Sequence, residues 1–525
     1  MGPMHARRGL AVLLVTLAAC GRCGRERPSA PERHVPAGTT AIVVPRLDDA
    51  ARSAAALLAT AEQFPALAGI SSRRAALVSQ LGFDPLDAKG LLRAGLDPTG
   101  GAALARTPAG SLAVLPVEDA ARLEETIARI ARDRLGAGPG ARVALPGAEV
   151  TLYRAAGSSS GLALAFADRF AFLATGPDGP AIAARAAGLA EADALSASAP
   201  WKAARAALPH RATAIWFAPP ATPALASFPM IRDGAALALS ATATSVEAVG
   251  AILLPAARLA AWREVAVGAG TGGADDLARL PADAVVAARL AGDPAPTARR
   301  LLALVPEGDR ARLAPLADGL LPLLAPGAAV SFSLAPTFDF TAFSRGRATA
   351  WDDPFRFVHA ALVLRARSPD DARRALDAIA AAAPALGLAA RTEPGTLALA
   401  RGPAVLRLAA EGDRVLAAGG DGRLDALRAL AARGGGLAPP VSADLAGGGF
   451  AGLALAPEAL VRGARALPDA AFGSGPDAFV MRSIADRVLD PASRLRGAAA
   501  RLELVEGAAV ITVRVEARPG AAVGP

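Results

Sequence analysis

A recurring order of apolar and polar positions is the most informative feature of this chain. Residues 111–127 begin with a short apolar segment and pass through an acidic turn, after which apolar side chains such as Leu123 and Ile127 recur at helical spacing. Residues 359–379 repeat the same order of apolar segment, acidic turn and apolar helical stripe. Each copy predicts a strand followed by a helix.

Other matched segments follow in the same order in both halves. Each half opens with a turn and a buried strand, continues through an antiparallel meander and closes with two alternating strands. The paired segments are 36–44 with 281–290, 151–154 with 396–399, 167–172 with 412–417, and 235–254 with 500–516. We therefore predict an α+β protein made of two duplicated halves, each an antiparallel sheet packed against helices.

Length and composition fit this plan. The chain has 525 residues, more than one hydrophobic core usually supports, and its 53% hydrophobic and 20% charged residues are typical of a folded protein. The expected parts are a signal peptide at 1–19, a disordered tether at 20–34, a first domain at 35–267, a glycine-rich linker at 268–279, a second domain at 280–518 and a tail at 519–525.

The N-terminus carries the most specific local signal. Two arginines precede an apolar run at 9–17, which is too short for a comfortable membrane span and is typical of a signal peptide. The run meets Leu17-Ala18-Ala19-Cys20, which resembles the lipobox of bacterial lipoproteins. The resemblance implies cleavage before Cys20 and acylation of its thiol with fatty acids such as palmitate. An ordinary secretory signal with an accidental cysteine is the alternative, and both interpretations export the protein to the cell envelope.

The distribution of charge and of potentially catalytic residues argues against several classes of function. The net charge of +8 is carried by arginines spread along the chain, without the basic block and interleaved aromatics of a nucleic-acid binder. Outside the first 34 residues the histidines are His210 and His359, each isolated near a predicted strand, so no nucleophile and base are brought together. Gly268, Gly270 and Gly273 spell G-x-G-x-x-G but follow a helical pattern, which indicates a linker. We expect no enzyme activity, no cofactor and no metal site.

An unusual concentration of aromatic residues lies in the second half. Its members are Phe332, Phe338, Phe340, Phe343, Trp351, Phe355 and Phe357. One interpretation is a two-stranded ribbon whose aromatic side chains fill the second core. The other is an exposed apolar contact patch formed by Phe338, Phe340, Phe343 and Trp351, with Arg345 and Arg347 at its tip.

Several local motifs resemble an uncharacterised family of exported bacterial proteins, a domain of unknown function that often occurs on lipoproteins. They are the proline-containing turn before each opening strand, the link Gly82-Phe83-Asp84-Pro85, and the helix that begins at Trp201 and ends in Leu208-Pro209. The resemblance supplies no catalytic residues.

The sequence thus predicts a lipid-anchored lipoprotein on the periplasmic side of the inner or outer membrane, with a non-catalytic binding or scaffolding role. A carrier of lipid or another apolar ligand is the alternative. Its expected partners are the membrane, held through the N-terminal anchor, and an unidentified envelope protein or apolar ligand, but not nucleic acid.

Overall fold

The computed structural model describes residues 30–61, 70–159, 161–220, 222, 225, 231–242, 244–266, 277, 279–344, 352–433, 436–437 and 449–518. The expected signal peptide, Cys20, nearly all of the glycine-rich linker, Trp351 and the tail lie outside the described residues.

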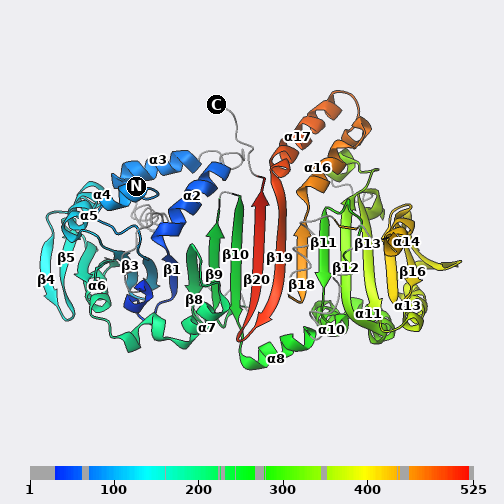
Figure 1. Cartoon of the computed structure of the whole chain (residues 1–525), viewed down its shortest axis with the longest axis horizontal. Coiled ribbons are helices and arrows are strands. Elements are labelled where there is room, and N and C mark those ends of the chain that lie inside the picture. Colours follow the sequence, from blue (N-terminus) through cyan, green and yellow to red (C-terminus); the bar gives the residue numbers. More distant parts are fainter. Residues whose placement is uncertain are drawn as a thin grey trace. The chain divides into compact units, whose positions relative to one another are not determined.

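The chain combines helices and antiparallel strands in two compact units. It is 39% helical and 35% strand, which agrees with the α+β class predicted from the sequence. Unit 1 comprises the chain up to Pro255 together with Val505–Val510, and unit 2 comprises Ala256–Leu504 together with the chain from Ile511. The two units are described separately below, with the element labels of Figure 1.

Unit 1 contains an antiparallel sheet. Its strands are β1 (Ala41–Pro45), β2 (Ala103–Thr107), β3 (Gly110–Pro116), β4 (Ala141–Leu145), β5 (Ala148–Arg154), β6 (Gly161–Ala167), β7 (Phe170–Gly176), β8 (Ala214–Ala218), β9 (Ala235–Ala241) and β10 (Ser245–Leu253). Their pairing gives the spatial order β10-β9-β8-β1-β2-β3-β7-β6-β5-β4.

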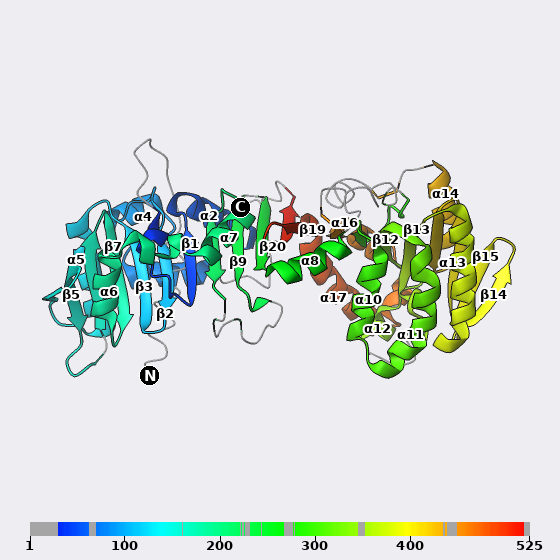
Figure 2. The same cartoon turned by 90° about the horizontal axis from the view of Figure 1, so that it is seen from below.

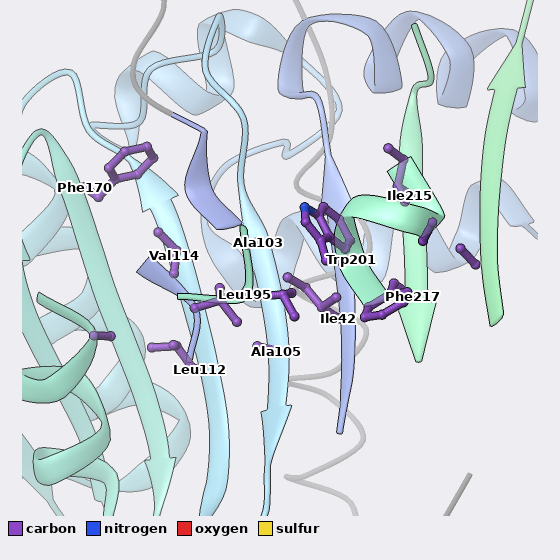
Figure 3. Close-up of a cluster of buried hydrophobic side chains, with 14 of the residues drawn as sticks. Ile42, Ala103, Ala105, Leu112, Val114, Phe170, Leu195, Trp201, Ile215 and Phe217 are labelled. Atoms are coloured by element: carbon purple, nitrogen blue, oxygen red, sulfur yellow. The ribbon is translucent and has the colours of Figure 1, made fainter. Parts of the chain in front are cut away.

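Helices cover both faces of this sheet. They are α2 (Leu47–Ala61), α3 (Ile70–Leu81), α4 (Ala88–Arg93), α5 (Ala120–Leu135), α6 (Gly179–Ala187) and α7 (Ala199–Ala207). Strand β7 shows why two faces are needed, because its side chains alternate. Phe170 and Phe172 belong to the buried cluster that includes Trp201 of α7 and alanines of α6, whereas Ala171 and Leu173 belong to the cluster that packs against α5. Figure 3 shows the first cluster.

Unit 2 also contains an antiparallel sheet. Its strands are β11 (Val286–Leu290), β12 (Leu324–Leu334), β13 (Val358–Ala366), β14 (Ala389–Glu393), β15 (Thr396–Arg401), β16 (Ala404–Glu411), β17 (Arg414–Gly419), β18 (Ala451–Leu455), β19 (Leu495–Val505) and β20 (Ala508–Ala517). The hairpin residues Val505–Val510 of β19 and β20 count with unit 1. Their pairing gives the order β20-β19-β18-β11-β12-β13-β17-β16-β15-β14.

The helices of unit 2 again lie on two faces. They are α8 (Ala256–Val265), α10 (Pro294–Leu304), α11 (Glu307–Leu320), α12 (Phe340–Ser344), α13 (Pro369–Ala382), α14 (Arg423–Arg433), α16 (Pro457–Arg465) and α17 (Pro476–Ser493). Val415 and Ala417 of β17 pack with α13, whereas Leu416 and Ala418 pack with α14. Helices α10, α11 and α13 lie side by side (Figure 2).

Three details differ from the expectations. The chain is folded before residue 35, because Pro31–His34 form a 3-10 helix and the buried His34 ring contacts Phe170 and Phe172 at 5.1 and 5.3 Å. The boundary between units falls before α8 rather than at residue 268, since Trp262 of α8 contacts Phe450 within unit 2. The sequence pattern does not indicate β4 and β14, whose side chains are mostly exposed and carry no regular alternation of apolar and polar residues.

Candidate functional site

Two long connections distinguish unit 2. Strands β2 and β3 of unit 1 are joined by Pro108 and Ala109 alone, whereas β12 and β13 of unit 2 are joined by residues 335–357. We call this segment, of which the structure describes residues 335–344 and 352–357, the aromatic connection. Strands β18 and β19 are joined by residues 456–494, the helical connection, which contains α16 and α17. Helices α16 and α17 lie beyond one end of the unit 2 strands (Figure 1).

Aromatic side chains join the two connections into one small core, the aromatic subdomain. The ring of Phe338 lies 5.5 Å from Phe343 and 5.7 Å from Phe357, and the ring of Phe340 lies 6.0 Å from Phe472 of the helical connection. Phe357 has no exposed surface. These ring distances are those of favourable aromatic pairs, so the rings hold the two connections together.

Short polar contacts determine the local turns of the aromatic connection. Asp339 caps α12 by accepting a hydrogen bond from the backbone N–H of Ala342 at 2.9 Å. The Thr337 hydroxyl donates to the carbonyl of Arg356 at 3.1 Å, and Arg356 pairs with Asp339 at 3.4 Å. A helical turn, α12, therefore forms at Phe340–Ser344, where one of the two sequence interpretations placed a two-stranded ribbon.

Helix α17 presents an apolar stripe to solvent. Phe479, Val480 and Ile484 are 79%, 53% and 45% exposed, while Ala485 and Leu489 on the opposite face are buried. At about 100° per residue the three exposed side chains project from one side of the helix. Clusters of exposed large apolar side chains on a folded protein mark interaction surfaces more often than isolated ones do.

Charged side chains continue the same face toward the C-terminal end of α17. Arg487 is exposed one turn after Ile484, and Asp490 follows it and pairs with Arg494 at 2.9 Å. On the inner side, the Arg482 guanidinium lies 4.9 Å from the centre of the Phe472 ring and pairs with Asp469 at 2.8 Å. The helix is thus apolar on its outer side in the first half and charged in the second.

The sequence candidates fall into different environments. Phe338 and Phe340 are half-buried within the aromatic subdomain, and Phe343 is 44% exposed. Trp351 and both arginines of the expected tip lie outside the described residues. The sequence interpretation did not single out Phe479, Val480 and Ile484. The signal that would have found them is a helix with apolar residues on both faces.

A half-buried arginine connects the ends of the aromatic connection. Nε of Arg423, the first residue of α14, donates to Nδ1 of His359 at 2.8 Å, and its Nη2 donates to Oγ of Ser333, also at 2.8 Å. The same guanidinium forms an ion pair with the carboxylate of Asp283, with Nη1 donating at 3.0 Å. Ser333 and His359 are register partners on β12 and β13, directly before and after the connection.

Two glycines make room for this arrangement. A Cβ atom on Gly419 would lie 1.9 Å from Cε1 of Phe355, and one on Gly420 would lie 2.3 Å from Cδ2 of His359. Burial, together with the positive charge of Arg423, lowers the pKa of His359, against the opposing effect of Asp283 and Asp421. His359 is therefore neutral at pH 7, which leaves the lone pair on Nδ1 free to accept the Arg423 hydrogen bond.

Unit 1 offers two open hollows. One is lined by residues that include Asp49, Arg52 and Arg211. The other is lined by Arg33, His34, Asp168, Arg169, Leu189 and Glu191. Asp168 and Arg169 form a left-handed two-residue turn with φ of 49° and 63°, and Arg169 approaches the buried Asp97 at 4.0 Å. Both hollows have charged side chains in their lining.

Neither a metal centre nor a membrane-spanning helix is found in the described part of the chain. Its histidine, cysteine, aspartate and glutamate side chains form no group of three or more able to hold a metal ion. None of its helices is both long and apolar enough to cross a bilayer. Comparison with protein-family models, curated proteins and solved structures returned no match. The resemblance to the uncharacterised exported family stays a prediction.

Proposed function

We propose that this protein is a cell-envelope lipoprotein, anchored through Cys20, that binds without catalysis and docks on a phospholipid bilayer through its aromatic subdomain. The observation that carries the docking is the exposed stripe of Phe479, Val480 and Ile484 on α17. Such side chains insert into the boundary between headgroups and acyl chains, and nearby arginines interact with anionic headgroups.

A bilayer is the occupant that best fits the chemistry of this face. The stripe forms a protruding helix surface and not a groove, so it suits a soft apolar layer better than a shaped partner. Arg487, exposed one turn after Ile484, supplies a cation that can bind a headgroup phosphate at the edge of the stripe. The acyl anchor inferred at Cys20 would already hold the protein at such a surface.

The duplication of the chain is part of this proposal. The two strand orders support it: raising each strand number of unit 1 by ten turns its order into that of unit 2. In both units the helix after the third strand packs on one face and the helix after the seventh strand packs on the other. On this interpretation the two connections of the aromatic subdomain were added to one copy, which gave that copy a second use.

Carriage of an apolar ligand has less support. The two hollows of unit 1 are open and lined by charged side chains, whereas a carrier requires an apolar enclosure. Native mass spectrometry of the delipidated protein separates the two functions. Copurifying lipid at a fixed ratio would favour the carrier.

Vesicle flotation tests the docking independently of the anchor. Cys20→Ser protein floats with anionic phospholipid vesicles at low salt, and the variant that also carries Phe479→Ser and Ile484→Ser loses at least about tenfold in binding, since each deletes an inserted apolar side chain. Val143→Ser is the matched control, because Val143 is a 39% exposed apolar residue of β4 in unit 1.

Equal flotation of the Phe479/Ile484 variant and the Val143 control would overturn docking through α17. The anchor has its own test. Intact mass and labelling with radioactive palmitate must show acyl chains on the wild type and none on Cys20→Ser.

A further inference from the structure

We propose that Arg423, His359, Ser333 and Asp283 form a pH-sensitive clamp that keeps the base of the aromatic connection, residues 335–338 and 355–357, closed, and that acidification opens this base and strengthens contact with anionic bilayers. The clamp is inferred from side-chain geometry alone, whereas its effect on bilayer contact rests on the proposed function.

The clamp holds both ends of one segment. Ser333 precedes the aromatic connection and His359 follows it, and one guanidinium binds both side chains at 2.8 Å. Arg423 belongs to α14, and Asp283 precedes β11, so the arginine also ties the connection to two other parts of unit 2. At the equivalent place in unit 1, the tight turn of Pro108 and Ala109 joins β2 to β3. No long segment there needs a clamp.

Protonation of His359 is incompatible with the closed geometry. The hydrogen bond from Arg423 uses the lone pair of Nδ1, and an imidazolium ring has no lone pair to accept it. The charged groups that face the ring are Arg423 of α14, Asp421 of the turn after β17, and Asp283 of the turn before β11. An imidazolium ion would be repelled by Arg423 and attracted by the two aspartates, so the guanidinium and the ring would separate.

Opening would release apolar surface. Phe355 lies against the Gly419 backbone beside the clamp, and Phe357 is fully buried two residues before His359. The backbone N–H of Ala335 donates to the carbonyl of Phe357 at 3.0 Å, which closes the base of the connection. When the Arg423 contacts are lost, this base frays and rings such as Phe338 become available for insertion.

Linkage determines the sign and the size of the effect. The pKa of His359 in the clamped form lies below the ordinary histidine value of 6.5, and in the opened form it returns toward that value. Between these two values the ratio of opened to clamped protein rises about tenfold for each unit by which the pH falls. Above pH 6.5 the clamp is insensitive to pH.

Hydrogen–deuterium exchange without vesicles tests the clamp itself. The variant His359→Asn keeps an acceptor, Oδ1, near the position of Nδ1 but does not titrate. At pH 5 the amides of Ala335, Phe338 and Phe357 exchange faster in the wild type than in His359→Asn, whereas at pH 7.5 the two proteins exchange alike. Comparison at equal pH cancels the intrinsic pH dependence of exchange. His210→Asn, which replaces an exposed histidine of unit 1, is the control and behaves as wild type.

Vesicle flotation then tests the consequence. Wild type floats several-fold better at pH 5 than at pH 7.5, and His359→Asn shows no such rise beyond the change seen with neutral-lipid vesicles. Asp283→Asn provides a second variant: it removes the ion pair that holds Arg423 and lowers the pKa of clamped His359 further, so the opened fraction below pH 6.5 is larger than in the wild type.

Identical exchange profiles of wild type and His359→Asn would overturn the clamp even if vesicle binding is strong. A pH-dependent difference in exchange without any flotation would retain the clamp and reject the bilayer as its target.

Discussion

The two units share an order of strands but differ in how two pairs of strands are connected. Unit 1 turns from β2 to β3 through two residues, whereas unit 2 uses residues 335–357 for the equivalent turn and residues 456–494 for the passage from β18 to β19. The shared strand order is therefore compatible with connections of very different length at these two places. What unit 2 gains is a second small core, an exposed apolar helix face and the hydrogen-bond network of the half-buried Arg423.

The largest expected effects test whether each unit has its own core. Phe172 of unit 1 and Phe357 of unit 2 are both fully buried, so Phe172→Ala and Phe357→Ala each lower the free energy of unfolding by about 3–5 kcal/mol. Hydrogen exchange should report the loss mainly in the unit that carries the substitution. Phe479→Ala is the control, and its change stays within about 0.5 kcal/mol because the ring is 79% exposed. An equal loss in both units after either substitution contradicts separate cores.

The glycines that end equivalent strands of the two units are expected to be required for different reasons. Strands β7 and β17 end in Gly176 and Gly419. Gly419→Ala would drive a Cβ into the Phe355 ring and is expected to cost about 1–3 kcal/mol while loosening the aromatic connection. Gly176 has a φ of 122°, so Gly176→Ala strains the backbone itself. Thermal denaturation measures both costs, and only the Gly419 variant should speed exchange at Phe357.

Gly308→Ala serves as the control for these two substitutions. Nothing lies within 4 Å of a Cβ at Gly308, which belongs to α11, so alanine should stabilise the helix by about 0.5–1 kcal/mol. A loss from Gly419→Ala no larger than the effect of the Gly308 control would contradict the close approach of Phe355.

Periodic stretches of this sequence predict their structure well, and the long connections do not. The stripe of Leu123 and Ile127 predicts α5, because a helix with one apolar face must pack on a sheet. One interpretation of the aromatic segment placed Phe338 and Phe340 in a two-stranded ribbon that fills the second core. They lie instead at a capped helical turn, since Asp339 competes for the backbone there and Phe472 supplies a distant apolar partner.

The clamp was not predictable from one sequence for a related reason. His359 and Arg423 are far apart in the chain, and neither belongs to a motif that announces the contact. Their meeting depends on the pairing of β13 with β17, on the start of α14, and on the two glycines that let the ring approach the backbone. Pairing of this kind is a property of the folded sheet.

A smaller effect concerns the buried histidine of unit 1. Burial is the main cause of the lowered pKa of His34, with Asp168 opposing it. A histidine whose pKa is lowered by folding stabilises the protein above the ordinary value of 6.5, and this stabilisation is lost as the pH falls toward the lowered pKa. Unit 1 should therefore lose up to about 1.4 kcal/mol per pH unit in that window. His34→Asn removes this slope in urea titrations at pH 5 to 7.5, and His210→Asn retains it.

The smallest expected effect concerns the N-terminal caps of two helices that occupy equivalent places in the two units. Asp119 accepts a hydrogen bond from the backbone N–H of Arg122 at 3.0 Å at the start of α5, and Ser368 accepts one from Asp371 at 3.1 Å at the start of α13. Each helix follows the third strand of its unit. If the two units use the same frame, Asp119→Ala and Ser368→Ala should each cost about 1 kcal/mol in chemical denaturation. If only one of the two substitutions lowers the free energy of unfolding, the two units share their strand order but are not stabilised by the same helix caps.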